Sequence, residues 1–386
     1  MNPIEKKTGL ALIAFLILLT GLCGCQSKGE ESQEDTASTG ITISEQDIEA
    51  GFIEKKEYKE FIETAESYLD RCEFQGSVLV AKGDEIIWAQ GYGSSDSKDE
   101  DAPSNTMNTV YEAGSITKQM TAAAILQLQE QGKLSVSDCI SKYFPKYKYG
   151  DQITLKMLLT MHSGLSDYIN DPEGFFGEEL GQELIQKEYD GESVDRDLPL
   201  QYFYDVPLLS EPGSRMFYCN TNYYLLALIV EQVSGISYDD YMQQNIFDRC
   251  GMNHANREFQ KTDAKGYDKQ GRYFSIPAGL AFGCGDVNDS VIDIFKWDRA
   301  LQNGTVISEA SFQEMTASKT YGYGVYADST SILHGGSTDV FNAYNIMYRK
   351  DDVTIVVMIN KPIEESSSTA VAGNIRKIYL DVMQNY

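Results

Sequence analysis

Apolar and polar positions alternate with two different periodicities along the chain, and these periodicities predict where strands and helices lie. Residues 76–93 (GSVLVAKGDEIIWAQGYG) contain two apolar runs separated by a Lys-Gly-Asp sequence at 82–84. This pattern predicts two strands joined by a tight turn. Residues 343–361 (AYNIMYRKDDVTIVVMINK) repeat it, with the turn at 349–352. Because hairpin strands pair antiparallel, the two segments predict one antiparallel sheet built from both ends of the chain.

Apolar residues at helical spacing flank the two hairpins. They recur at this spacing between positions 58 and 69, and a last helix is expected over roughly 368–383. The intervening sequence is mostly helical or irregular in pattern and carries an acidic, glycine-bearing insertion at 166–200. The fold class predicted is α/β: an antiparallel sheet with the terminal helices on one face, plus a mostly helical subdomain. The α/β part would comprise residues 55–118 and 271–386, and the helical subdomain residues 119–270.

The first 54 residues differ from the rest. Residues 1–25 read as a lipoprotein signal peptide, in which two lysines precede an apolar stretch, 9–22, that is short for a membrane span. This stretch ends in LCGC, which resembles a bacterial lipobox and implies lipidation of Cys25. A plain secretory signal is the alternative. Residues 26–54 are polar, acidic and poor in aromatic side chains, which predicts a flexible linker.

Composition narrows the classes of function. The formal net charge is −26, and such an acidic surface repels nucleic acid. The chain has 3 histidines, widely spaced, and contains neither an H-E-x-x-H motif nor a Cys/His cluster, so a built-in metal site is not expected. The cysteines that follow the signal peptide are odd in number and scattered, which does not suggest a disulfide framework.

The stretch GSITKQMTAAAILQLQEQG, residues 114–132, predicts a helix with a buried stripe. Its apolar residues recur every four positions, at Ile116, Met120, Ala124 and Leu128. Gly132 is a suitable end for this helix. Only its beginning is unusual, because a serine and a lysine stand there one helical turn apart.

Ser115 and Lys118 are candidates for a nucleophile and its base. Ser115 lies in the first turn, where backbone N–H groups lack helical partners and favour developing negative charge. Lys118, three residues on, shares its face. A buried lysine releases its proton more readily and could then take the serine proton. A plain helix-terminal serine is the alternative, since a second S-x-x-K at Ser95 and Lys98 lies in the acidic sequence SSDSKDE, expected to be solvated loop.

Two further elements carry candidate chemistry. Tyr218 and Asn220 form a Y-x-N pattern ahead of a strongly apolar helix. A phenol beside a lysine can act as a base, and an amide can hold a substrate carbonyl or amide group. In LHGGSTDVF, residues 333–341, two glycines after His334 permit the close backbone approach that an oxyanion hole needs. Each pattern is weak alone, because Y-x-N recurs at 168–170 and a glycine pair also suits a turn.

SITK, YCN and HGG in this order resemble the serine β-lactamase-like family, which includes class C β-lactamases, DD-peptidases and related esterases. The resemblance spans about residues 57–380. ITLKMLLTMHSGLSDY is similar to the family's LLTHTSGL segment, and NIFDRCGMNHA resembles its IFxPLGM turn. The resemblance implies a β-lactamase/transpeptidase-like fold.

The same resemblance implies roles for individual residues. Ser115 would be the acylated nucleophile, with Lys118 and Tyr218 sharing the proton transfers. Asn220 would bind a substrate amide. The backbone N–H groups of Ser115 and Ser337 would form the oxyanion hole. The strand motif would consist of His334, Gly335, Gly336 and Ser337. No cofactor is implied.

Departures from the family pattern affect the expected substrate. His334 replaces the usual lysine and, if uncharged at neutral pH, attracts a substrate carboxylate less. Gly335 removes a hydroxyl group often present there. Val340 stands where a glycine is common and is expected to narrow the rim of the site. Cys219 is interpreted as a small buried residue and not as a nucleophile, because nothing identifiable activates it.

The sequence therefore predicts a membrane-tethered, extracytoplasmic serine hydrolase that works through an acyl-enzyme on Ser115. Its substrates would be D-Ala-D-Ala-type peptides or β-lactams. One alternative is an esterase or D-amino-acid amidase with the same machinery, and another is a non-catalytic penicillin-sensing module. The chain is expected to be a monomer, lipid-anchored on the outer face of the cell membrane or secreted.

Overall fold

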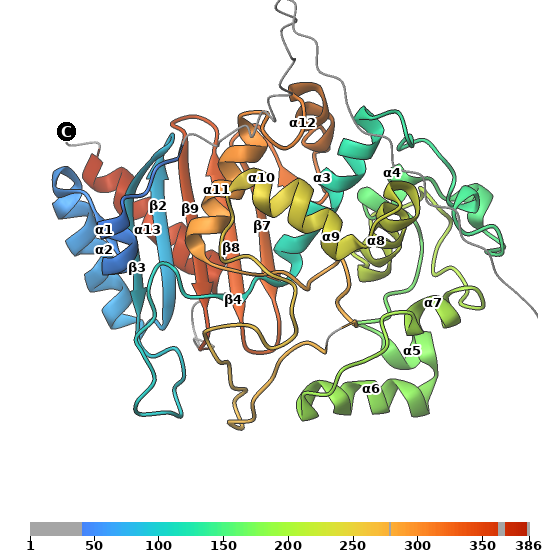
Figure 1. Ribbon diagram of the computed structural model, residues 1–386, viewed down its shortest axis with the longest axis horizontal. Coiled ribbons are helices and arrows are strands. Elements are labelled where there is room, and N and C mark those ends of the chain that lie inside the picture. Colours follow the sequence, from blue (N-terminus) through green and yellow to red (C-terminus); the bar gives the residue numbers. More distant parts are fainter. Residues whose placement is uncertain (1–40, 278, 362–366, 384–386) are drawn as a thin grey trace, which may run out of the picture. The chain divides into compact units, whose positions relative to one another are not determined.

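A seven-stranded sheet assembled from both ends of the chain organises the molecule (Figure 1). The strand order is β1-β3-β2-β9-β8-β7-β6, and every neighbouring pair is antiparallel. The strands are β1 (Ile53–Glu54), β2 (Gly76–Lys82), β3 (Glu85–Tyr92), β6 (Tyr326–Ala327), β7 (Ser331–Ser337), β8 (Asn342–Tyr348) and β9 (Val353–Ile359). The N-terminal and C-terminal hairpins join where β2 pairs with β9, for example Val78 with Val357. Both hairpins and their turns confirm the sequence prediction.

The computed structural model describes residues 41–277, 279–361 and 367–383, except for the side chains of 188 and 189. Cys25, the signal peptide and the first part of the linker lie outside these residues, so the lipidation prediction stays a prediction. Within the described ranges, no helix combines the length and apolar character needed to cross a membrane.

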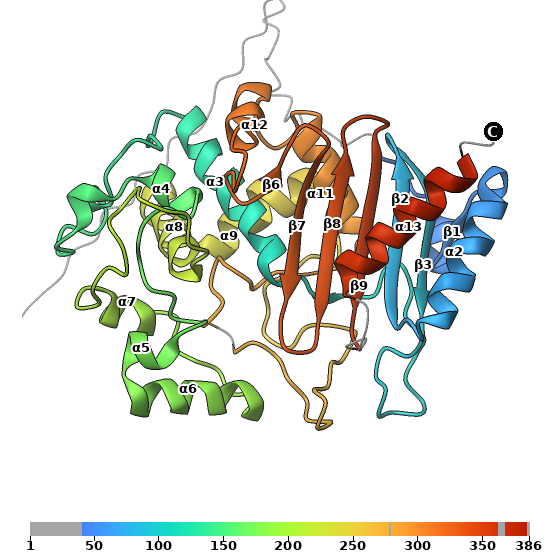
Figure 2. The same ribbon diagram turned by 180° about the vertical axis from the view of Figure 1, so that it is seen from behind.

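Two terminal helices, α2 (Lys59–Arg71) and α13 (Ser368–Met383), pack side by side on one face of the sheet (Figure 2). Their apolar residues form a core with the outward face of β2, β3, β8 and β9. At its centre Phe61 meets Trp88 and Tyr379 edge to face, with ring centroids 5.9 and 5.4 Å apart. Such pairs add to the free energy of burial. Trp88 is fully buried.

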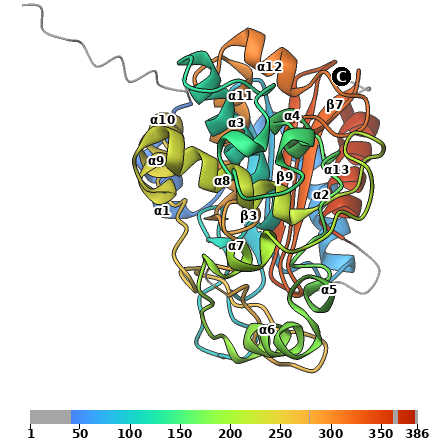
Figure 3. The ribbon, with the colours of Figure 1, turned by 90° about the vertical axis from the view of Figure 1, so that its right-hand side faces the viewer.

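A second, larger core fills the space between the opposite face of the sheet and the helical region (Figure 3). The helices of this side are α3 (Thr117–Glu130), α4 (Leu155–Leu159), α8 (Asn220–Ser234), α9 (Tyr238–Met242), α10 (Asp248–Cys250), α11 (Val291–Gln302) and α12 (Glu309–Met315). The acidic insertion forms α5 (Pro172–Phe176), α6 (Glu178–Asp190) and α7 (Leu198–Phe203). The separation into a sheet part and a helical part agrees with the predicted fold class.

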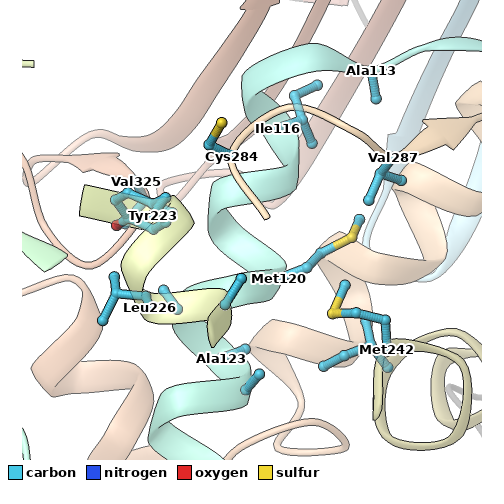
Figure 4. Packing of buried hydrophobic residues seen from close by; sticks show 14 of the residues in the cluster. Ala113, Ile116, Met120, Ala123, Tyr223, Leu226, Met242, Cys284, Val287 and Val325 are labelled. Carbon is cyan, nitrogen blue, oxygen red and sulfur yellow. The ribbon is translucent and has the colours of Figure 1, made fainter. Parts of the chain in front are cut away.

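The helix α3 is buried on every side and not only along the predicted stripe. Residues 117–128 are all buried. Figure 4 shows α3 enclosed by Tyr223 and Leu226 of α8, by Met242 of α9 and by Cys284 and Val287. A fully enclosed helix gives the side chains of its first turn a fixed position, which matters for the site described below.

Three sequence predictions are wrong in detail. The end of the predicted linker is ordered: α1 (Glu45–Ala50) is capped by the Ser44 side chain, and β1 adds the edge strand to the sheet through Ile53. Ser95 is buried and not solvated, and its backbone forms hydrogen bonds with two neighbouring segments. Val340 is buried beside Gly266, a Cβ on which would lie 2.3 Å from Val340 Cγ2, so it packs away from the rim of the site.

Candidate active site

The nucleophile candidate lies in a short 3₁₀ turn, Gly114–Ile116, that leads into α3. A two-residue strand, β4 (Tyr111–Glu112), precedes this turn and pairs with β5 (Asn288–Asp289). Gly114 adopts a positive φ of 52°, which lets the chain change direction sharply before Ser115. The strand, the turn and the buried helix together fix where the serine side chain points.

Lys118 lies fully buried one turn further on. Its Nζ atom donates to Ser115 Oγ at 2.8 Å, to Asn220 Oδ1 at 2.8 Å and to the Cys284 carbonyl oxygen at 2.6 Å. The amide and carbonyl oxygens can only accept hydrogen bonds. The serine hydroxyl can also donate a hydrogen bond. A neutral Lys118 amine would therefore still donate to Asn220 and to the Cys284 carbonyl oxygen, and its nitrogen could accept from Ser115. The three contacts therefore suit either protonation state of Lys118.

A buried carboxylate, Asp167, holds Asn220 in this orientation. It accepts the Asn220 backbone N–H and side-chain amide, both at 3.0 Å, and also hydrogen bonds from Ile169 and Asn170. Because the Nδ2 group of Asn220 faces Asp167, its oxygen faces Lys118. Sequence reasoning missed Asp167, whose only sequence signal is its place in the SGLSDY segment.

Tyr218 approaches Lys118 through the face of its ring, with Nζ 4.9 Å from the ring centroid. The face of an aromatic ring attracts cations, so this contact suits a lysine ammonium group. Cys219, the next residue, is buried, and burial raises the pKa of its thiol far above the ordinary value. The interpretation of Cys219 as a small buried residue is consistent with this environment.

The strand β7 lies directly against the turn that carries Ser115. A Cβ on Gly336 would lie 1.8 Å from the Ala113 carbonyl oxygen and 3.1 Å from Ser115 N. A Cβ on Gly114 would in turn lie 3.1 Å from Ser337 N. Only glycine permits this approach at position 336, and both Ser115 and Ser337 line the same cleft.

His334 is neutral and tied on both ring nitrogens. Nδ1 lies 2.6 Å from the Gly335 carbonyl oxygen, and Nε2 lies 2.9 Å from the Tyr321 hydroxyl. Since a carbonyl oxygen can only accept, Nδ1 carries the proton and Nε2 accepts from Tyr321. Burial and the positive charge of Lys118 lower the pKa of His334 to about 3. The predicted uncharged state at neutral pH agrees with this environment.

These elements surround a cleft of about 440 Å³. It is lined by seven of the residues singled out from the sequence: Ser115, Tyr218, Asn220, His334, Gly335, Gly336 and Ser337. Lys118 lies behind Ser115. Cys284 and Tyr326 also line the cleft, and no sequence pattern pointed to either residue. Cys284 contributes a backbone carbonyl, which has no side-chain signature, and Tyr326 lies on a two-residue strand.

A hydroxyl in contact with a buried amine, at a cleft that two backbone N–H groups also border, can perform acyl transfer through a covalent intermediate. With the antiparallel sheet and the helical region, this arrangement defines a serine hydrolase of the β-lactamase type. The family comparison agrees: residues 62–380 match the Beta-lactamase family model. The chain belongs to the Beta-lactamase family.

Individual relatives support the same family. The chain is 31% identical to a Bacillus subtilis (strain 168) protein named for penicillin binding, PbpX, over 97% of this chain and 93% of that protein. It is 28% identical to the teichoic acid D-alanine hydrolase of Staphylococcus aureus (strain MRSA252), over 82% of this chain and 76% of that protein. The octameric penicillin-binding protein homologue from Pyrococcus abyssi superposes with a TM-score of 0.69 at 25% identity, covering 83% of this chain and 77% of that chain.

Proposed function

We propose that this hydrolase forms its acyl-enzyme on Ser115 and acts on D-amino-acyl esters or amides. The observation that carries the proposal is the 2.8 Å contact between Lys118 Nζ and Ser115 Oγ in a buried setting. Neutral Lys118 takes the Ser115 proton while Oγ bonds to the substrate carbonyl carbon. The resulting oxyanion accepts hydrogen bonds from the Ser115 and Ser337 backbone N–H groups.

The second half of the reaction returns the proton. The bond to the leaving oxygen or nitrogen breaks, and the proton held by Lys118 passes to the leaving group, with Tyr218 assisting. Water then attacks the acyl carbon, gives its proton to Lys118 and releases the acid, while Oγ recovers a proton. The ring face of Tyr218 stabilises the lysine charge in the interval.

The charge of the cleft supports esters or amides as substrates over peptides that end in a free carboxylate. Among the described residues that line the cleft there is no lysine, arginine, aspartate or glutamate. His334 is neutral, with both ring nitrogens engaged. A substrate carboxylate would find no charged partner among these lining residues, and removing an unpaired carboxylate from water costs free energy. The similarity to a teichoic acid D-alanine hydrolase supports a D-alanyl substrate.

D-Ala-D-Ala-type peptides and β-lactams remain the second candidate, supported by the relative named for penicillin binding. The test compares kcat/KM for a D-alanyl ester, a D-amino-acid amide and a peptide ending in D-Ala-D-Ala. We expect the ester or amide to be preferred by about 10²-fold or more, the scale on which an unpaired buried group is rejected. A preference for the peptide would reverse the assignment. Stable penicillin labelling without turnover of any substrate would favour a sensing module.

We also propose that the protein works outside the cell, held by a lipid on Cys25, and that it is a monomer. The LCGC sequence and the cell-wall polymer named in the relative support the location. Replacement of Cys25 by alanine should move the protein from the membrane fraction to the medium or the soluble fraction. Light scattering tests the oligomeric state, since the Pyrococcus abyssi homologue is octameric.

A further inference from the structure

Glu112 is a buried carboxyl group three residues before Ser115 that the proposed reaction does not use. It lies on β4, pairs with Asn288 of β5, and has only 8% of its surface exposed. Burying a carboxyl group costs free energy unless neighbouring groups satisfy it. The identity of those neighbours therefore indicates what the group is for.

Three segments around the cleft meet at this carboxyl group. Ser275 Oγ donates to Glu112 Oε1 at 2.6 Å. The Thr338 hydroxyl and the Ile276 backbone also approach the carboxyl group and favour its charged form, although Oε2 makes no full hydrogen bond. Thr338 directly follows Ser337, and Ile276 lines the cleft. Glu112 is thus hydrogen-bonded to the Ser275–Ile276 segment, which forms one wall of the site, and lies close to Thr338 beside another wall.

The turn that contains Thr338 is itself tightly bonded. Thr338 N donates to the Phe341 carbonyl oxygen at 3.0 Å, and Phe341 N donates to Thr338 Oγ1 at 3.1 Å. A carboxylate that accepts from the Thr338 hydroxyl therefore holds the whole turn, including the adjoining Ser337. The backbone N–H of Ser337 is one of the two oxyanion donors of the proposed function, on which this inference rests.

Glu112 has no ion-pair partner among the groups that face it. Asn288 faces it from β5, Thr338 from the turn, and Tyr273 and Ser275 from the segment before the cleft. Glu112 also lines an adjoining cavity of about 290 Å³, whose other charged residues are Arg196, Asp239, Arg257, Glu258 and Asp286. Arg257 is paired with Asp239 and Asp286, and Arg196 with Glu231. Burial raises the pKa of Glu112 to about 7, against the hydrogen bonds from Ser275, Thr338 and Ile276.

We propose that Glu112 is a positioning residue whose ionised carboxylate draws the Ser337 turn and the Ile276 segment against the turn that carries Ser115. The ionised form has two accepting oxygens: Oε1 accepts from Ser275, and Oε2, which has no full hydrogen bond, can accept from the nearby Thr338 hydroxyl and Ile276 backbone. The protonated form must use one oxygen as a donor and accepts fewer of these hydrogen bonds. The oxyanion donors are therefore better placed when Glu112 is charged, and acylation of Ser115 should speed up as pH rises through neutrality.

The test is the pH profile of kcat/KM for the E112Q variant of the chain from residue 26 onward, with a D-alanyl ester as substrate. Glutamine keeps the shape of the side chain but resembles the protonated form at every pH. We expect a fall of about tenfold at pH 8, the scale of one charge-assisted hydrogen bond. We expect no difference at pH 5 and loss of the inflection near pH 7. The melting temperature at pH 8 should stay at or above that of the wild type, because a buried charge is removed.

The matched control is D298N, which removes another buried carboxyl group of raised pKa, on α11 and in contact with Asn345. It should leave the inflection near pH 7 unchanged. An unchanged profile in E112Q, loss of the inflection in D298N as well, or an equal loss at every pH with a lower melting temperature would each overturn the proposal. Wild-type protein that neither turns over nor forms a Ser115 adduct would overturn the proposed function itself, which is a different result.

Discussion

The carboxylate of Asp167 accepts both the backbone N–H and the side-chain amide of Asn220, each at 3.0 Å, and so aims the Asn220 oxygen at Lys118. The two residues lie far apart in the sequence, and both are buried in the protein interior. This pairing fixes the acceptor that holds the Lys118 amine. It leads to the first prediction.

Replacement of Asp167 by asparagine should cost at least about tenfold in kcat/KM and about 1–3 kcal/mol in the free energy of unfolding. The new amide nitrogen would face buried donors and leave them unsatisfied. D171N is the control, because Asp171 is exposed at the start of α5 and accepts a hydrogen bond from Gly174 N. Asparagine caps the N-terminus of a helix as well as aspartate does. Urea denaturation and steady-state kinetics of both variants test this prediction. Similar stability and kcat/KM for D167N and D171N would show that Asp167 does not orient Asn220.

Replacement of Lys118 by alanine should lower kcat/KM by roughly 10²-fold or more, the usual effect of losing a general base. The lysine of the other S-x-x-K sequence offers the comparison. Lys98 is exposed and contacts the Gly271 carbonyl oxygen, so K98A should have nearly wild-type kinetics. Full activity in K118A would remove Lys118 from the mechanism.

Replacement of Gly336 by alanine should lower kcat by about 10²–10³-fold, as loss of an oxyanion donor does. The added Cβ would lie 1.8 Å from the Ala113 carbonyl oxygen, so β7 and the Ser115 turn must separate. Gly373 lies in α13 with nothing within 4 Å of an added Cβ. G373A should keep full activity and gain some stability through helix propensity. Steady-state kinetics with circular dichroism would show whether G336A fails in catalysis or merely in folding.

Asp298 should make the protein less stable as pH rises. Burial raises its pKa from 3.8 to about 8, so the folded state holds a proton that the unfolded state has already lost. Stability is then greatest below about pH 4 and falls as pH rises towards 8, by about 1.4 kcal/mol for each unit of difference. D298N should be more stable than the wild type at pH 8 and similar at pH 4. Melting curves of both proteins between pH 4 and pH 8 test this. A stability difference between D298N and the wild type that does not change with pH would refute the prediction.

The fold could be read from the sequence where long, regular patterns determine it. The two hairpins and the last helix are of this kind, because alternation and helical spacing report which face is buried. Short elements were missed: α1 and β1 hold six and two residues, and β1 exists only because β3 offers it an edge. The complete burial of α3 depends on α8 and α9 covering it, which no local pattern shows.

The candidate site divides in the same way. Ser115, Lys118, Tyr218 and Asn220 lie in recognisable motifs, and the structure brings them into one cleft or directly behind it. The residues that hold them were not foreseen. Asp167 acts on a residue from a distant segment, Cys284 acts through its carbonyl oxygen, and the partners of Glu112 come from two other segments. Such contacts follow from the tertiary fold alone.

The central claim is that Ser115 is the acylated nucleophile, and active-site labelling tests it most directly. The chain from residue 26 onward would be treated with a fluorophosphonate and, separately, with penicillin, and the modified peptide located by mass spectrometry. We expect an adduct on Ser115 that is absent from S115A and retained in S95A, whose serine is buried away from the cleft. An adduct that survives in S115A, or one that maps to another residue, would contradict it.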